Sequence, residues 1–153
     1  MLHFAYGSNM HRGVMRKHAP TAVPLGLARL ADYRFVITSD GYASVEPARA
    51  QSVHGLLWRL TPRDRVTLDL WENVAAGQYR AEILPVDERG RRRSALVYIA
   101  RRRPVGQPKP GYIEIIVKAA HERQMPAGYI ATLEQWLPKR SLGAGYRKLG
   151  EFA

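Results

Sequence analysis

Residues 2–9 read Leu-His-Phe-Ala-Tyr-Gly-Ser-Asn, and the prediction of the fold starts from this stretch. Residues 2–6 are short, apolar and aromatic, which is typical of a buried strand, whereas Gly7, Ser8 and Asn9 favour a turn. A buried strand that ends in such a turn exposes successive backbone N–H groups, which can bind a carboxylate or an oxyanion. On spacing alone, an ordinary strand-to-helix turn explains the same residues.

A short basic helix is expected directly after this turn. Met10 and Val14 lie at helical spacing, and Pro20 is expected to end the helix. Ser8 or Asn9 is the expected N-cap, because both side chains can accept a hydrogen bond from the first turn of a helix.

Five further segments up to residue 100 have the apolar patterning of strands. They are residues 25–38, 42–45, 52–60, 78–86 and 94–100. A break in the pattern near Ala31-Asp32 indicates a bend or bulge in the first of them. Gly55 indicates a close approach of another backbone, and the last two segments predict a hairpin around the turn at residues 87–90.

A helix is predicted to begin at residue 62. Thr61 is a good N-cap, Pro62 suits the first helical position, and Asp64 complements the positive end of the helix dipole. This helix interrupts the series of strands.

The apolar residues of this helix predict which face is buried. Val66, Leu70 and Val74 lie at spacing i, i+4 and i+8, so we expect them to face the core. Glu72 then falls on the opposite side, which predicts a solvated carboxylate. Its neighbour Trp71 is apolar, however, and apolar surroundings raise the pKa of a carboxyl group towards values that suit acid–base catalysis.

The chain changes character after residue 100. Three prolines and two glycines in residues 101–111 predict an ordered loop, and residues 112–137 predict two short helices. Residues 1–137 are therefore expected to form one domain, followed by a basic C-terminal tail at residues 138–153. Strands before helices predict an α+β fold with a mixed or antiparallel sheet that curls towards a barrel.

Composition limits the chemistry that this chain can perform. The 153 residues have a formal net charge of +11, which favours acidic partners, and contain no cysteine. Thiolate metal sites, iron–sulfur clusters and cysteine nucleophiles are thereby excluded. The five scattered histidines and the absence of cofactor-binding motifs predict no metal ion and no cofactor. Since no signal peptide or membrane-spanning run is apparent, a cytoplasmic location is expected.

Arginines are concentrated at the predicted hairpin. Seven of them lie within the fifteen residues 89–103. Such a patch can bind phosphates, but only Tyr98 lies between the clusters as an aromatic residue on which a base could stack. A solvated rim is the favoured interpretation, and nucleic-acid binding stays an alternative.

Several of these segments together resemble the gamma-glutamylcyclotransferase family, which includes AIG2-like proteins. Phe-Ala-Tyr-Gly-Ser-Asn at residues 4–9 is similar to the hallmark strand and loop of that family. Val-His-Gly-Leu-Leu-Trp-Arg-Leu at residues 53–60 resembles its glycine-containing strand. Residues 68–83 resemble its pattern of Leu-Asp, a glutamate and Tyr-x-Arg. Order and spacing agree from residue 1 to about residue 135.

The resemblance implies a small mixed β-barrel-like sheet flanked by short helices, and an enzyme. It would cyclise a small gamma-glutamyl substrate and release 5-oxoproline together with an amine or amino acid. Glu72 would be the catalytic acid and base. The resemblance and the predicted anion-binding turn together imply these substrate-binding residues: His3, Phe4, Ala5, Tyr6, Gly7, Ser8, Asn9 and Tyr112. His3 departs from the family, in which a tyrosine is common at this position.

The implied chemistry needs no nucleophile from the enzyme, because the α-amine of the substrate can attack its own γ-carbonyl. Two other functions stay open on the sequence alone. The pocket could bind a small acidic metabolite without catalysis, or the arginine-rich rim could bind nucleic acid. The leaving amine and the oligomeric state are not encoded in any recognisable motif.

Overall fold

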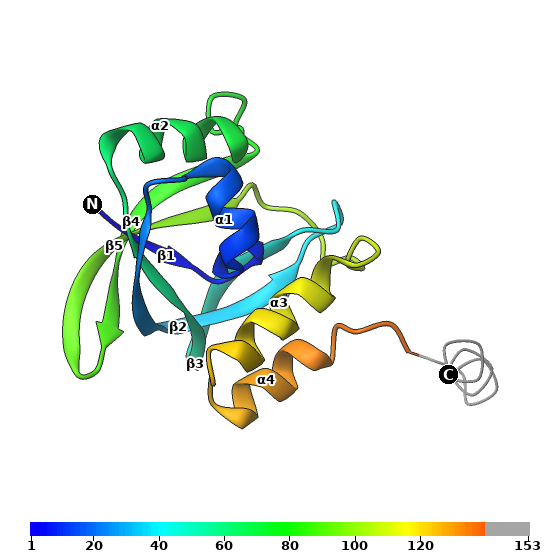
Figure 1. Ribbon diagram of the computed structural model, residues 1–153. Helices are drawn as coiled ribbons and strands as arrows, with labels where there is room; N and C mark the ends of the chain where they lie inside the picture. Colours follow the sequence, from blue (N-terminus) through cyan, green and yellow to red (C-terminus); the bar gives the residue numbers. More distant parts are fainter. Residues whose placement is uncertain (140–153) are drawn as a thin grey trace, which may run out of the picture.

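Five strands close into a barrel in the computed structural model, which describes residues 1–139 (Figure 1). In spatial order the strands are β1 (Leu2–Ala5), β3 (Ala43–Arg59), β2 (Val23–Ile37), β4 (Tyr79–Glu88) and β5 (Arg91–Ala100). The parallel pairing of β1 with β5 closes the barrel, and all other neighbours are antiparallel. The predicted α+β fold with a mixed, barrel-like sheet is confirmed.

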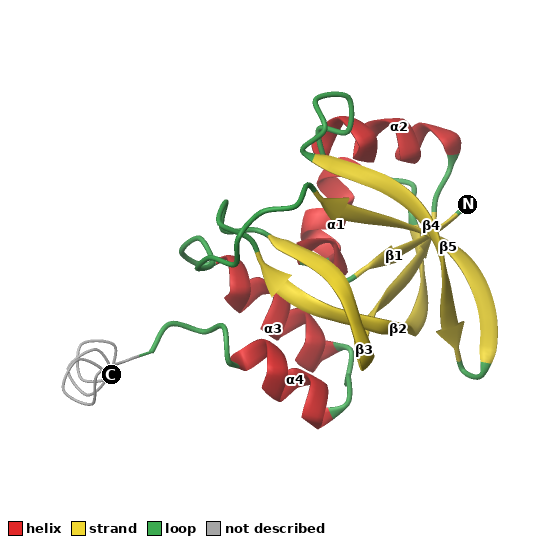
Figure 2. Cartoon of the chain, turned by 180° about the vertical axis from the view of Figure 1, so that it is seen from behind, coloured by secondary structure: helices red, strands yellow, loops and turns green. Residues whose placement is uncertain are grey.

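The helices lie outside the barrel at two places. They are α1 (Arg12–His18), α2 (Pro62–Trp71), α3 (Tyr112–Glu122) and α4 (Ala127–Glu134), preceded by the 3₁₀ turn η1 (Ser8–Met10). Figure 2 shows α3 and α4 side by side below the barrel and α2 at its opposite end. The two short C-terminal helices are thus confirmed. No helix in residues 1–139 is both long and apolar enough to cross a lipid bilayer.

Helix α2 begins where the sequence predicts. The Asp64 backbone N–H donates to the Thr61 hydroxyl at 3.2 Å, and the Thr61 N–H donates to the Asp64 carboxylate at 3.0 Å. This reciprocal capping box, with Pro62 at the first helical position, fixes the direction in which the helix leaves β3.

The predicted buried face of α2 is wrong. Val66 is 60% exposed and Leu70 is 73% exposed, whereas Leu68 is fully buried. The helix turns Asp64, Leu68 and Glu72 inwards, again at spacing i, i+4 and i+8. Because two of these three residues are acidic, a search for apolar periodicity selects the opposite face.

One strand replaces the two that were predicted in residues 42–60. Strand β3 is continuous, and it pairs with β2 on both sides of a register shift that leaves residues 48–51 without register partners. The bend near Ala31-Asp32 is confirmed as a shift in the β2–β3 register at Asp32, whose φ is 62°. The Asp32 carboxylate accepts a hydrogen bond from the Ala50 N–H at 3.0 Å, which stabilises the bulge.

The N-cap of α1 is His11, not Ser8 or Asn9. The His11 Nδ1 atom accepts a hydrogen bond from the Gly13 N–H at 3.1 Å. Ser8 and Asn9 instead form η1, a helical turn that intervenes between β1 and α1. The chain therefore turns once more than the sequence pattern suggests.

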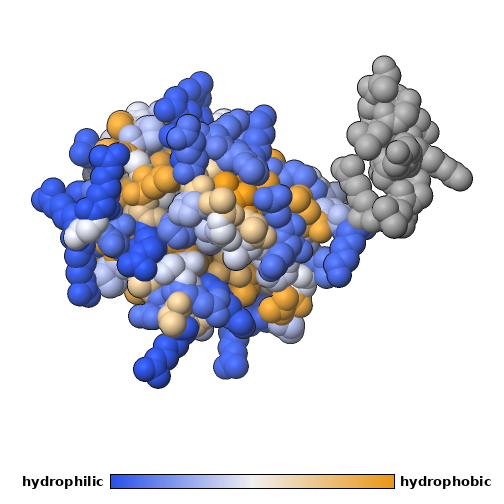
Figure 3. All heavy atoms as spheres, turned by 90° about the horizontal axis from the view of Figure 1, so that it is seen from below, coloured by the Kyte–Doolittle hydropathy of each residue, from blue (hydrophilic) through white to orange (hydrophobic). Residues whose placement is uncertain are grey.

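The barrel interior and the inner faces of α3 and α4 form one core. Among its largest fully buried side chains are Phe4, Leu56, Leu96 and Ile116. The hairpin of β4 and β5 and the loop at residues 101–111 occur where they were predicted. On the face shown in Figure 3, long hydrophilic side chains surround smaller apolar patches. Most of the predicted C-terminal tail, residues 140–153, lies outside the described residues.

Candidate active site

A cavity of about 690 Å³ opens where β1, η1, the end of α2 and the start of α3 meet. All nine residues that the sequence analysis selected line this cavity. They are His3, Phe4, Ala5, Tyr6, Gly7, Ser8, Asn9, Glu72 and Tyr112. Residues separated by as many as 109 positions are therefore brought to one space by the barrel.

Glu72 is held at the point where α2 ends. Its backbone N–H donates to the Leu68 carbonyl at 2.9 Å, and the next residue, Asn73, has a left-handed φ of 53°, which stops the helix. Burial raises the pKa of the Glu72 carboxyl from 4.5 to about 7. Within residues 1–139 this carboxyl has no hydrogen-bond or ion-pair partner, so it can both take and return a proton near neutral pH.

The turn at residues 7–9 offers hydrogen-bond donors to the same cavity. The Gly7 and Ser8 carbonyls accept from the N–H groups of Met10 and His11, each at 3.0 Å, and so hold the turn in place. The backbone N–H groups of Gly7, Ser8 and Asn9 themselves make no hydrogen bond to any other described residue. Three successive N–H groups of this kind suit a carboxylate or a developing oxyanion.

Tyrosines form much of the remaining wall, and backbone groups fix their rings. The Tyr79 hydroxyl donates to the Ala43 carbonyl at 2.8 Å, while the Tyr112 hydroxyl accepts from the Ala43 N–H at 3.1 Å. The Tyr6 hydroxyl donates to the Tyr98 carbonyl. Burial raises the pKa of Tyr112 to about 12 and that of Tyr6 well above its usual value. These phenols therefore stay neutral at physiological pH.

His3 is a buried and neutral part of the wall. Its Nδ1 atom lies 3.0 Å from the Leu96 carbonyl oxygen, and because a carbonyl only accepts, Nδ1 must carry the proton. Burial lowers the pKa of His3 to about 4. The ring packs edge-on against Tyr98 with centroids 5.4 Å apart. His3 thus occupies an aromatic position without adding charge to the cavity.

Several wall residues were missed by the sequence analysis. His18 stacks on Trp71 with ring centroids 3.7 Å apart, and this pair joins α1 to α2 beside Glu72. Tyr42 and Gln78 complete another side. No local pattern distinguishes these side chains from ordinary surface or core residues, because they meet only when distant segments pack together.

No metal-binding cluster is present in the described part of the chain. Residues 1–139 hold no group of three or more His, Asp or Glu side chains placed to ligate a metal ion. The chemistry considered below uses only the side chains and backbone groups that line the cavity.

Comparisons with known proteins extend over nearly the whole chain. A gamma-glutamylcyclotransferase of Mus musculus is 27% identical over 153 residues, covering 93% of this chain and 81% of the relative. The gamma-glutamylcyclotransferase of Homo sapiens is 26% identical with the same coverage. A solved structure of a gamma-glutamyl cyclotransferase superimposes with a TM-score of 0.85 at 25% identity, covering 94% of this chain and 91% of that one.

A family match places these similarities in a single group. The AIG2-like family model matches residues 52–133, which is more than half of the chain. The matched segment includes Glu72 and Tyr112, while the N–H-rich turn at residues 7–9 precedes it. The chain therefore belongs to the AIG2-like family.

Proposed function

We propose that this chain is an enzyme that cyclises a gamma-glutamyl compound, releasing 5-oxoproline and a free amine or amino acid. The names of the relatives that match it over most of their length support this reaction. One observation in this chain carries the proposal: Glu72, a carboxyl group with a pKa of about 7, shares a cavity with the three N–H groups of residues 7–9.

The reaction needs a group that removes a proton from the attacking nitrogen and supplies one to the leaving nitrogen, and we assign both transfers to Glu72. Its carboxylate takes a proton from the substrate α-ammonium, and the resulting amine attacks the γ-carbonyl carbon to close a five-membered ring. When the tetrahedral intermediate collapses, the bond from carbon to the leaving nitrogen breaks and Glu72 returns its proton to that nitrogen. The ring nitrogen, which still carries one hydrogen more than the product lactam, loses that proton to solvent water. The carboxylate is regenerated, and no covalent enzyme intermediate is needed.

The turn and the tyrosines contribute to the rate acceleration by holding the substrate in position. Well-oriented intramolecular reactions reach effective molarities of about 10⁵–10⁸ M, so holding the substrate in a folded pose lowers the barrier greatly. We assign this task to the N–H groups of Gly7, Ser8 and Asn9, which bind the substrate carboxylate or the oxyanion. Tyr6 and Tyr112 give the cavity its shape as neutral walls.

The direct test is the substitution Glu72→Gln, which keeps the size of the side chain and removes proton transfer. We expect kcat to fall by about 10²–10⁴ on the best of a panel of gamma-glutamyl compounds, with 5-oxoproline detected by mass. Glu114→Gln is the matched control, because Glu114 is exposed on α3 and does not line the cavity. A wild-type rate in Glu72→Gln would refute the role of Glu72.

The same panel separates catalysis from binding alone. A non-catalytic binder of acidic metabolites would raise its melting temperature with these compounds and yet form no 5-oxoproline. An enzyme forms 5-oxoproline and the free amine in equal amounts.

A further inference from the structure

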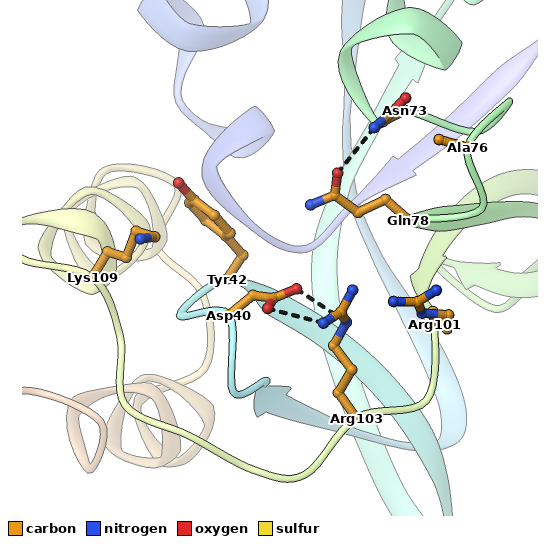
Figure 4. A pocket seen from close by; sticks show the side chains of 8 residues that line it. All are labelled: Asp40, Tyr42, Asn73, Ala76, Gln78, Arg101, Arg103 and Lys109. Atoms are coloured by element: carbon orange, nitrogen blue, oxygen red, sulfur yellow. Dashed lines mark hydrogen bonds and ion pairs between the residues drawn. The ribbon is translucent and has the colours of Figure 1, made fainter.

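A second cavity adjoins the first and has a different character. Its volume is about 520 Å³, and it is lined by Asp40, Tyr42, Asn73, Ala76, Gln78, Arg101, Arg103 and Lys109 (Figure 4). Tyr42 and Gln78 line both cavities, and Asn73 directly follows Glu72 in the chain. The second cavity therefore adjoins the first at the wall formed by Tyr42 and Gln78, next to Glu72.

This cavity carries two cationic side chains that no described carboxylate neutralises. Asp40 and Arg103 form an ion pair with two contacts of 3.0 Å and so cancel one another. Arg101 and Lys109 have no ion-pair partner within residues 1–139, and they approach the pocket from opposite sides (Figure 4). The net charge of the lining is thus positive by two.

Backbone hydrogen bonds hold the main chain at the two residues that carry these cations. The Arg101 N–H donates to the Gln78 carbonyl at 3.0 Å, and the Lys109 N–H donates to the Gly41 carbonyl at 3.1 Å. The Lys109 ammonium also lies 5.6 Å from the centre of the Tyr42 ring, a wall residue shared with the first cavity. The loop at residues 101–111 is anchored at both ends against the site.

The reaction requires space for the leaving group next to Glu72, because Glu72 protonates the departing nitrogen. The buried residues His3, Phe4 and Ala5 close the inner side of the first cavity. The leaving group can extend past Tyr42 and Gln78 into the second cavity. There the two cations favour an anionic group, and a neutral or cationic amine gains nothing from them.

We propose that the second cavity is the leaving-group subsite and that Arg101 and Lys109 select an acidic amino acid, whose two carboxylates match the two cations. This inference rests on the proposed cyclisation. The preferred substrate class is then a gamma-glutamyl dipeptide whose second residue is glutamate or aspartate.

Two dipeptides of nearly equal size test this selection. Gamma-glutamyl-glutamate and gamma-glutamyl-glutamine differ by one negative charge in the leaving group. For the wild-type chain at low salt, we expect kcat/KM to be about two- to fivefold higher for the acidic dipeptide, the range typical of partly exposed charge pairs. The ratio should fall as salt is added, because solvent ions screen exposed charges.

Single substitutions locate the source of the preference. Arg101→Gln and Lys109→Gln should each lower the ratio of kcat/KM values towards one. Arg102→Gln is the control, because Arg102 is exposed on the same loop, carries the same charge and does not line the cavity. It should leave the ratio unchanged, and melting temperatures verify that all three variants fold.

Each outcome has a distinct meaning. Equal kcat/KM values for the two dipeptides in the wild-type chain overturn the subsite while leaving the cyclisation intact. An equal loss of preference in Arg101→Gln and Arg102→Gln also overturns it, because the general positive charge of the chain then explains the effect. Failure to form 5-oxoproline from any gamma-glutamyl compound overturns the proposed function itself.

Discussion

A carboxyl group with a pKa of about 7 is present in both protonation states at neutral pH, and Glu72 owes this property to burial alone. No cation in the described chain pairs with it, and none of the cavity tyrosines donates to it. A single residue can therefore serve as base in the first half of the reaction and as acid in the second.

This property predicts the pH dependence of the reaction. Glu72 must be ionised to accept the first proton, so kcat/KM should rise about tenfold per pH unit below pH 7 and level off above it. The cavity histidines His3 and His18 have pKa values that burial lowers, so neither explains an inflection near 7. The profile is measured from pH 5 to 9 by 5-oxoproline formation.

The variant Glu72→Gln provides the control for this profile. Its residual activity should lack the inflection near pH 7, because the substituted side chain does not titrate. A flat profile in the wild-type chain, or an unchanged inflection in the variant, would contradict the assignment.

At the scale of single elements, the site depends on how closely β3 passes β1. A Cβ atom on Gly55 would lie 2.5 Å from the Ala5 carbonyl oxygen and 2.7 Å from the Phe4 ring. No side chain fits there without moving β1, and β1 carries three residues that line the cavity. Glycine is required here by a close approach, as the sequence pattern indicates.

Gly55→Ala should therefore lower both stability and activity. We expect the free energy of unfolding in urea to fall by about 1–3 kcal/mol, the usual cost of overpacking, with a lower kcat/KM because β1 shifts. Gly128→Ala is the matched control, since a Cβ atom there meets nothing within 4 Å and the residue lies in α4. The control should be neutral or slightly stabilising. Equal effects of the two substitutions would contradict the close approach.

Elements whose signals are local could be predicted from the sequence. The Thr61-Pro62-Asp64 start of α2 and the strand before Gly7 depend on neighbouring residues, and both are observed. The buried face of α2 could not be predicted, because only one of its three residues, Leu68, is apolar. The other two are a catalytic candidate, Glu72, and a capping residue, Asp64. Apolar periodicity does not predict the buried face of a helix when an acidic side chain with a functional role lies on that face.

The continuous strand β3 shows a second limit of prediction. Its middle residues 46–51 are Glu, Pro, Ala, Arg, Ala and Gln, which lack the apolar alternation of a strand and are mostly exposed. Glu46 and Pro47 pair with Arg34 and Tyr33 of β2, whereas residues 48–51 lie at the shift in register and have no register partner on that strand. The stacking of His18 on Trp71 shows a third limit, since 53 positions separate the two residues and only the folded barrel brings them together.

At the scale of the whole molecule, arginines of the two clusters occupy different environments. Arg93 pairs with Glu88 at 2.8 Å at the hairpin, Arg103 pairs with Asp40, and Arg101 lines the second cavity. Three of the seven arginines of residues 89–103 are therefore engaged in ion pairs or in the second cavity. This division favours a small acidic substrate over a nucleic-acid phosphate backbone, which requires a continuous basic surface.

The burial of Glu72 in the cavity should lower the free energy of unfolding of the whole chain when its carboxyl group is ionised. Burial raises its pKa from 4.5 to about 7, so the folded chain holds this proton more tightly than the unfolded chain does. The free energy of unfolding should consequently fall as the pH rises through this interval. By pH 8 this loss of stability reaches about 3 kcal/mol.

The substitution Glu72→Gln removes the ionisable group, and with it the loss of stability that ionisation causes. In urea unfolding, the variant should gain stability relative to the wild-type chain between pH 4.5 and pH 8, whereas the exposed control Glu114→Gln should show no such change. A stability difference that does not depend on pH would mean that Glu72 is solvated in the folded chain. The pKa that permits catalysis would then be lost as well, because the same desolvation that destabilises the fold gives Glu72 its ability to return a proton at neutral pH.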